Sequence, residues 1–184
     1  MNFRYTIIAL WLIWLVYWIV SAFGNKRTAQ TSRVWRIMAL LVLFGVFALW
    51  QNFPAFFDQR FLPRTFAGAL TGTILCALGI AFSIWARAIL GRNWSSNPSI
   101  KEGHELVQSG PYRFARHPIY TGLLLAILGT GIASGKYGDI MLFLTIAVMF
   151  TIKLRIEESL MQRQFAEQYT EYRKHTKALI PFVL

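Results

Sequence analysis

Three uninterrupted apolar runs constrain this chain more than any other feature of its sequence. They cover residues 5–23, residues 37–50 running on to 57, and residues 66–85. Each run is close to the ~20 residues that an α-helix needs to cross a ~30 Å hydrocarbon core. Hydrophobic residues make up 55% of the 184 residues and charged residues only 15%, which is unusual for a soluble domain. The chain is therefore predicted to be an integral membrane protein.

The cationic residues are distributed unevenly between the loops. Most of the 19 Lys and Arg residues lie within residues 26–36, 87–116 and 153–177. The others, which fall in the alternate loops, are Arg4, Arg60, Arg64 and Lys136. The positive-inside rule then places the N-terminus outside and the C-terminus in the cytosol. The net charge of +11 is accordingly attributed to cations that orient the chain in the membrane and attract anionic lipids, and not to nucleic-acid binding.

The second half of the chain is less regular. A polar stretch, residues 90–118, precedes two short apolar runs, residues 119–133 and 140–152, which a Gly-rich turn over 129–139 would join. At 1.5 Å per residue each run is about 20–23 Å long. They either cross the membrane with flanking residues or form a hairpin that crosses incompletely, and both ends return to the same face in either case.

The C-terminal segment, residues 153–174, has the periodicity of an amphipathic helix. Its apolar stripe contains Met161, Phe165, Tyr169 and Tyr172, and Glu158 lies in line with it. Such a helix would lie along the cytosolic interface. The predicted fold is all-α and polytopic: about five transmembrane helices plus this C-terminal amphipathic cytosolic helix, in a single membrane domain over residues 1–184.

Ionisable groups of opposite sign lie at the two ends of the predicted hairpin. Arg113, Arg116 and His117 precede the fourth apolar run, and Glu157 and Glu158 follow the fifth. Ionisable residues at the edge of the hydrocarbon are costly and are therefore candidates for function. The alternative is an Arg–Glu pair that only fixes the hairpin.

Two motifs in this half resemble a known family. "HELVQSGPYRFARHPIYTGLLLAILG" at 104–129 and "RIEESLMQRQFAEQYTEYRKHTKALIP" at 155–181, with "LGRNWS" at 90–95, are similar to the isoprenylcysteine carboxyl methyltransferases. The likeness to phospholipid N-methyltransferases is looser. Residues 1–89 match only as three spanning helices, so residues 90–184 would form the cofactor and catalytic half. The length resembles the smaller prokaryotic branch, which implies a prokaryotic cell membrane.

The resemblance implies methyl transfer from S-adenosyl-L-methionine inside the cytosolic leaflet, onto a lipophilic or lipidated substrate that enters from the bilayer. The segments that would bind the cofactor contribute His104, Leu106, Tyr112, Arg116, His117, Pro118, Tyr120, Gly122, Glu157 and Glu158.

The chemistry of these side chains agrees with that implication. Arg116 or His117 suits the cofactor carboxylate, and the helix beginning near Pro118 adds its dipole. Glu157 or Glu158 suits the ammonium or the ribose hydroxyls. Two of these residues have alternative roles: Tyr120 as an interfacial aromatic residue and Gly122 as a helix-packing residue. The three histidines of the chain are not paired at helical spacing, so no metal site is predicted.

The acceptor decides which further residues are needed. A carboxylate is already ionised, so it needs only a cation to orient it, and Arg113 is the candidate, with a topology anchor as its alternative role. A lipid amine would need a general base, for which Glu158 is the candidate. Asn93 and Trp94 could line the substrate mouth. We favour carboxyl O-methylation, with amine methylation and a non-enzymatic membrane protein as the alternatives.

Overall fold

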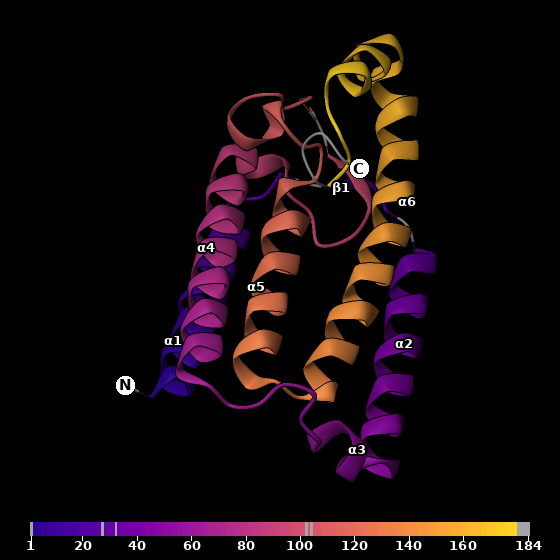
Figure 1. Cartoon of the computed structure of the whole chain (residues 1–184). Helices are drawn as coiled ribbons and strands as arrows, with labels where there is room; N and C mark the ends of the chain where they lie inside the picture. The colour runs from indigo at the N-terminus through magenta and orange to yellow at the C-terminus, as the bar shows by residue number, and fades with distance from the viewer. Residues whose placement is uncertain (1, 27, 32, 102, 104, 180–184) are drawn as a thin grey trace.

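The computed structural model describes residues 2–26, 28–31, 33–101, 103 and 105–179. The elements in chain order are α1 (Phe3–Ala22), β1 (Thr28–Thr31), α2 (Arg33–Asn52), α3 (Pro54–Asp58), α4 (Phe66–Leu90), β2 (Ser99–Lys101), α5 (Pro118–Ser134) and α6 (Tyr137–His175). The prediction of a helical fold is confirmed, apart from one short antiparallel ladder in which β1 pairs with β2. The long helices lie side by side, with the loops gathered at the two ends (Figure 1).

Helices α4 and α5 form the tightly packed centre of the molecule. Gly79 faces the backbone of Ala126, and a Cβ placed on Gly79 would lie 2.4 Å from the Ala126 nitrogen. Gly122 of α5 in turn faces Ser83, whose nitrogen would lie 2.7 Å from an added Cβ. Small residues at such positions let two helix backbones approach closely, which maximises van der Waals contact in an apolar environment.

Helix α1 packs its tryptophans against both α4 and α5. The Trp14 and Trp18 rings stack with centroids 4.6 Å apart, and the Trp11 indole nitrogen donates to Thr130 Oγ1 at 3.1 Å. The other face of α1 exposes apolar side chains, as Val16 at 60% illustrates. An apolar face of this extent is typical of contact with lipid or with another protein.

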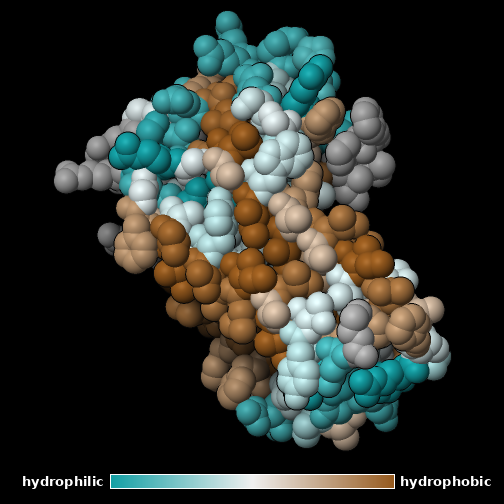
Figure 2. Space-filling view, turned by 90° about the vertical axis from the view of Figure 1, so that its left-hand side faces the viewer, coloured by the Kyte–Doolittle hydropathy of each residue, from teal (hydrophilic) through white to brown (hydrophobic). Residues whose placement is uncertain are grey.

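Hydropathy divides the molecule into an apolar band between two hydrophilic ends (Figure 2). Among the described residues, Phe3–Ala22 and Phe66–Asn93 are long and apolar enough to cross a membrane, while Ile37–Asn52 and Pro118–Ser134 are shorter apolar helices. The band is consistent with a membrane protein. The count of five spans is not confirmed by helix length and composition.

The predicted second run ends earlier than its hydropathy suggests. Residues 37–57 form two helices, because α2 ends at Asn52 and the short α3 begins at Pro54. Proline disfavours helical geometry in the residue before it, and Phe53 has φ −129° and ψ 47°. Apolar composition alone therefore overestimated the length of this element.

The prediction of a turn over residues 129–139 is wrong for most of that segment, which is helical. Helix α5 continues to Ser134, with Gly129 and Gly131 buried inside it, and the chain turns at Gly135, which has φ 68°. Here the glycines serve close helix packing, since a Cβ on Gly129 would lie 2.5 Å from the Cys76 nitrogen.

The fifth apolar run and the C-terminal helix are continuous. Both belong to α6, which has 39 residues. The predicted amphipathic helix is thus an extension of the fifth apolar run, as expected, but it is interrupted at Ala166, whose φ of 40° and ψ of −107° are not helical. This residue redirects the last turns of α6, which curl back at the end of the molecule (Figure 1).

Substitution of Gly79 tests the close contact between α4 and α5. Gly79→Ala should destabilise the protein by about 1–3 kcal/mol, because the added methyl overlaps the backbone of α5. Thermal unfolding in detergent measures the loss. Gly45→Ala in α2 is the matched control: nothing lies within 4 Å of an added Cβ there, so stability should stay equal or rise. Equal effects of the two substitutions would contradict the packing argument.

Candidate active site

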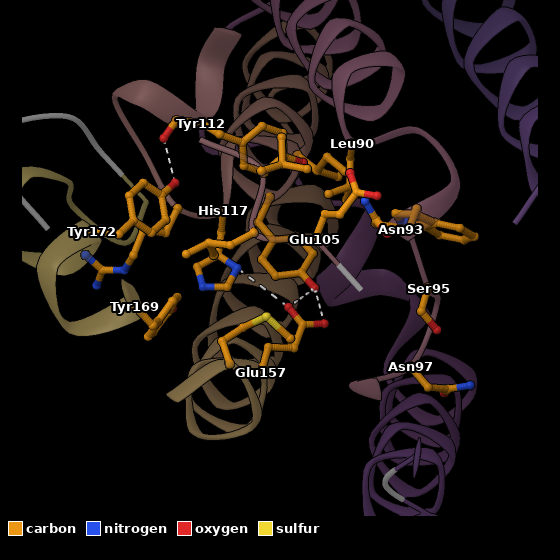
Figure 3. A pocket seen from close by; sticks show the side chains of 17 residues that line it. Leu90, Asn93, Ser95, Asn97, Glu105, Tyr112, His117, Glu157, Tyr169 and Tyr172 are labelled. Atoms are coloured by element: carbon orange, nitrogen blue, oxygen red, sulfur yellow. Dashed lines mark hydrogen bonds and ion pairs between the residues drawn. The ribbon is translucent and has the colours of Figure 1, made fainter. Parts of the chain in front are cut away.

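One cavity lies where the loops after α4 meet the start of α5 and the second half of α6 (Figure 3). Its volume is about 130 Å³. The lining residues come from these segments; they are Leu90, Asn93, Trp94, Ser95, Asn97, Glu105, Leu106, Val107, Tyr112, Arg116, His117, Ile119, Tyr120, Glu157, Met161, Tyr169 and Tyr172.

The C-terminal residues hold the entry to α5 in place. The Arg116 amide donates to the Lys177 carbonyl at 2.8 Å, and the His117 amide donates to the Ala178 carbonyl at 3.0 Å. Pro118 follows as the first residue of α5 and is fully buried. A proline is well suited to this position because the first turn of a helix needs no amide donor. The backbone that carries Arg116 and His117 is thus fixed on both sides.

Glu157 points into the cavity and is surrounded by donors. The Tyr120 hydroxyl lies 2.7 and 2.8 Å from its two carboxylate oxygens (Figure 3). His117 Nδ1 lies 3.6 Å from Oε2, and Lys153 Nζ lies 3.7 Å from Oε1. This carboxylate faces the cavity while it is hydrogen-bonded by α5, so it is held in one orientation before any ligand binds.

Glu158 faces away from the cavity and pairs with Arg116. Arg116 Nε donates to Glu158 Oε1 at 2.7 Å, and its Nη1 donates to the Thr176 carbonyl. Glu158 lies beyond the apolar run of α6. Burial raises the pKa of its carboxyl, but the nearby His117 ring and the hydrogen bond and charge of Arg116 outweigh burial and hold the pKa at about 2. Glu158 is therefore an ionised anchor and a weak base.

Two buried polar atoms at the cavity lack hydrogen-bond partners among the described residues. They are Asn93 Oδ1 and His117 Nε2. The His117 atom lies 3.5 Å from Glu158 Oε1, without hydrogen-bond geometry. Buried polar atoms are rarely left unpaired, so two of them in residues that line one cavity point to a polar ligand.

Tyrosines form the wall of the cavity on the side of the C-terminal helix. Tyr169 and Tyr172 follow the change of direction at Ala166, and both are buried. The Tyr172 hydroxyl donates to the Tyr112 carbonyl at 2.6 Å (Figure 3). Burial raises the pKa of Tyr112, so its phenol stays neutral. The apolar stripe predicted for this segment thus packs over the site.

Arg87 positions Trp94 at the edge of the cavity. Its guanidinium is buried and donates to the Gly91 carbonyl, the Ser21 carbonyl and Asn25 Oδ1 at 2.6–2.9 Å. It also lies 4.8 Å from the Trp94 ring centroid. From the sequence, Arg87 was expected only to orient the chain in the membrane. The structure shows instead a buried cation that links α1, α4 and the loop after α4.

The structure brings most of the predicted site residues together. Those that line the cavity are Asn93, Trp94, Leu106, Tyr112, Arg116, His117, Tyr120 and Glu157. Glu158 and Pro118 support the site from behind, and Gly122 packs against α4, which was its alternative role. Arg113 is exposed and lines a separate hollow with Gln168 and Glu171. His104 lies outside the described residues.

Lys153 is a site residue that the sequence reasoning missed. It is buried, donates to the Ser96 carbonyl at 2.8 Å, and lies 5.2 Å from the Tyr120 ring centroid. Its position four residues before Glu157 was the available signal, because side chains at that spacing lie on one helix face. Lys153 balances the charge of Glu157.

The arrangement can bind a zwitterion. Cationic or donor groups from Arg116 and His117 and the carboxylate of Glu157 face one cavity, with tyrosine rings as walls. No group of three His, Cys, Asp or Glu side chains that could hold a metal ion occurs among the described residues.

Comparison with known proteins gives consistent matches. A family model described as phospholipid methyltransferase matches residues 67–168. The cobalt-zinc-cadmium resistance protein CzcN of Cupriavidus metallidurans is 30% identical over 87% of this chain and 68% of its own length. The protein-S-isoprenylcysteine O-methyltransferase of Saccharomyces cerevisiae is 26% identical over 99% of this chain and 80% of its own length.

One solved structure is similar over most of the chain. It is the eukaryotic intramembrane Ras methyltransferase, isoprenylcysteine carboxyl methyltransferase, with 27% sequence identity and a TM-score of 0.57. The match covers 84% of this chain and 54% of that protein, so this chain spans about half of its length.

Replacement of Glu158 by Gln tests the anchor assignment. The variant loses the ion pair with Arg116 and should be less stable by about 1–3 kcal/mol. The pKa is depressed from 4.5 to about 2, so the carboxylate contributes fully above pH 4.5 and its contribution fades as the pH falls toward 2. The stability difference from the unmodified protein should therefore be present at pH 5 and should shrink as the pH is lowered from 4.5 toward 2.

The matched control is Glu171→Gln, because Glu171 is an exposed glutamate on the same helix. Its melting temperature in detergent should stay close to that of the unmodified protein. A stability difference for Glu158→Gln that disappears between pH 5 and 8 would contradict the low pKa.

Proposed function

Because this chain belongs to the phospholipid methyltransferase family and is similar to isoprenylcysteine methyltransferases, we propose that it is an S-adenosyl-L-methionine-dependent membrane enzyme. The acceptor we propose is the carboxylate of a lipophilic, isoprenylcysteine-like substrate. We place the site on the cytosolic side of a prokaryotic cell membrane, because most Lys and Arg residues lie in the loops at that end.

One observation carries this proposal: the two motifs converge on one cavity. His117 from the Arg-His-Pro segment and Glu157 from the Glu-Glu pair lie within 3.6 Å of each other at the cavity wall. The apolar helix α4 ends at this cavity and the apolar helix α5 begins at it. A site at this boundary is accessible to a polar cofactor from the water and to a lipophilic substrate from the bilayer.

The chain's own residues fit the cofactor. When bound, S-adenosyl-L-methionine supplies a methyl group activated by a sulfonium. His117 has a buried nitrogen without a hydrogen-bond partner, which suits the cofactor carboxylate better than Arg116, since Arg116 is occupied by Glu158. Glu157 suits the ammonium or the ribose hydroxyls. Asn93 Oδ1 offers a buried acceptor without a hydrogen-bond partner among the described residues.

The cavity must widen to take the whole cofactor. Its volume of about 130 Å³ is below the roughly 300–1,000 Å³ of ligand pockets. The wall formed by Tyr169 and Tyr172 is attached through the non-helical residue Ala166, where the helix can change direction without breaking a regular hydrogen-bond ladder. Closing such a wall over the ligands would exclude water and hold the reactants in line, and proximity can supply ~7–11 kcal/mol.

The position and ionisation of Glu158 favour a carboxylate as the methyl acceptor. It requires no general base, whereas a protonated amine does. Glu158, the base considered from the sequence, is ion-paired, faces away from the cavity and has a pKa of about 2. Arg113, considered for orienting the carboxylate, lies outside the cavity, so the proposal does not depend on it.

A lipid amine is the second candidate acceptor. The name of the matching family model favours it, and Glu157 is a carboxylate inside the cavity that could accept a proton. The two acceptors differ in the product: a methyl ester is labile to base, and a methylated amine is not.

Cofactor binding is the first test. The purified full chain in detergent should bind tritiated S-adenosyl-L-methionine, and absence of binding at millimolar concentration would exclude both enzymatic proposals. Glu157→Gln should weaken binding roughly 10- to 150-fold, since a hydrogen bond to a charged group contributes about 1.5–3 kcal/mol. Glu171→Gln, the exposed control on the same helix, should bind normally.

The acceptor is tested with a transferred tritiated methyl group. A farnesylcysteine-type acid should yield a base-labile product, and phosphatidylethanolamine should yield little. A base-stable product from the amine lipid alone would overturn the carboxylate assignment while it leaves the methyltransferase proposal in place.

A further inference from the structure

A second cavity lies at the other end of the molecule, far from the candidate active site. Its volume is about 940 Å³. It is bounded by the start of α1, the segment from α3 to α4, and the turn between α5 and α6, all of which lie at the same end (Figure 1). The family match begins at residue 67 and the active-site motifs lie at the opposite end, so nothing described above assigns it a role.

Cationic side chains gather around this cavity. Arg4, Arg60, Arg64 and Lys136, which are the cations of the otherwise cation-poor loops, all line it. They come from three segments that are distant in the sequence, and only the fold brings these segments together. Since the positive-inside rule disfavours cations at this end, their convergence on one cavity needs a separate explanation.

The acidic residues nearby neutralise only part of this charge. Asp58 pairs with Lys136 at 2.7 Å, and Asp139, which lines the cavity, accepts from the Ser134 hydroxyl. The side chains of Arg4 and Arg64 form no ion pair or hydrogen bond within the described part of the chain. These two guanidinium groups are therefore available for an anionic ligand.

The backbone around these cations is fixed. Arg60 and Lys136 form a β-bridge, and the Phe61 amide donates to the Gly135 carbonyl at 2.9 Å. Arg60 Nη1 also donates to the Ser134 carbonyl at 2.6 Å. The loop before α4 is thereby attached to the turn before α6, which holds two of the cations side by side.

Three long helices begin at the cavity. The lining includes Asn2 and Phe3 at the start of α1, Thr65 and Phe66 at the start of α4, and Lys136 just before α6. The positive end of each helix dipole lies at its N-terminus, so all three favour negative charge in the same region. The dipoles and the arginines act in the same direction.

Apolar residues form the rest of the cavity wall. Ile7, Ile8, Ala69 and Ala133 line the part that lies toward the apolar band, and the stacked pair of Trp50 and Phe57 lines another side. A free inorganic anion gains nothing from such a wall. An amphiphile with an anionic head and a hydrocarbon tail gains from both parts of the cavity.

We propose that this cavity binds an anionic phospholipid, with its phosphodiester at Arg4 and Arg64 and its acyl chain against the apolar wall. The bound lipid would link α1 to the loop before α4 and to the turn before α6, which are neighbours here but distant in the sequence. It would therefore stabilise the end of the bundle that lacks the C-terminal attachment found at the active site.

The test measures lipid retention by the purified full chain in detergent, using native mass spectrometry. Dioleoylphosphatidylglycerol should be retained in preference to dioleoylphosphatidylcholine, with one molecule bound tightly. The double variant Arg4→Gln/Arg64→Gln should bind phosphatidylglycerol roughly tenfold or more weakly. Arg155→Gln/Arg163→Gln, a pair of exposed cations on α6, removes the same charge and should bind as the unmodified protein does.

Four results would overturn the proposal. They are equal retention of the two lipids by the unmodified protein, equal losses in the two double variants, normal binding by Arg4→Gln/Arg64→Gln, and displacement of phosphatidylglycerol by inorganic phosphate at a similar concentration. The first and last are measured on the unmodified protein, so they remain decisive if a variant fails to fold. Arg4→Lys/Arg64→Lys should restore most of the affinity.

Discussion

The backbone contact between α4 and α5 is the interaction on which the rest of the structure depends. Gly79 and Gly122 allow the two helices to approach until their backbones touch. That approach places the start of α5, with His117 and Pro118, beside the loop that follows α4, with Asn93 and Trp94. Because the candidate active site draws on both segments, the distance between these helices sets the distance between its walls.

The glutamate pair of α6 divides two tasks between adjacent residues. Glu157 faces the cavity and is oriented by Tyr120, while Glu158 pairs with Arg116 on the side away from it. Successive residues on a helix point about 100° apart, so one cannot replace the other. The Arg–Glu pair that the sequence suggested as a purely structural alternative is therefore present as Arg116–Glu158. It lies beside the candidate active site rather than replacing it.

The family and most cavity residues were predicted through the resemblance of the motifs at 90–95, 104–129 and 155–181, and the opposite charges at the two ends of the apolar hairpin predicted that Arg116 and the glutamate pair come together. The sequence did not predict the change of direction at Ala166, since neither glycine nor proline marks that position. Lys153 was overlooked because a lysine at a membrane boundary is usually a topology signal. The cavity around Arg4 and Arg64 depends on loops that are distant in the sequence, and no local pattern reveals such contacts.

The attachment of the C-terminal residues to the start of α5 has a consequence for biosynthesis. Arg116 donates to the carbonyl of Thr176, which follows it by 60 residues. A ribosome must therefore synthesise the chain through residue 176 before this contact can form, whereas α4 and α5 can pair much earlier. A nascent chain arrested in the first half of α6 would contain the paired α4 and α5 but not the contacts that hold the start of α5 in place.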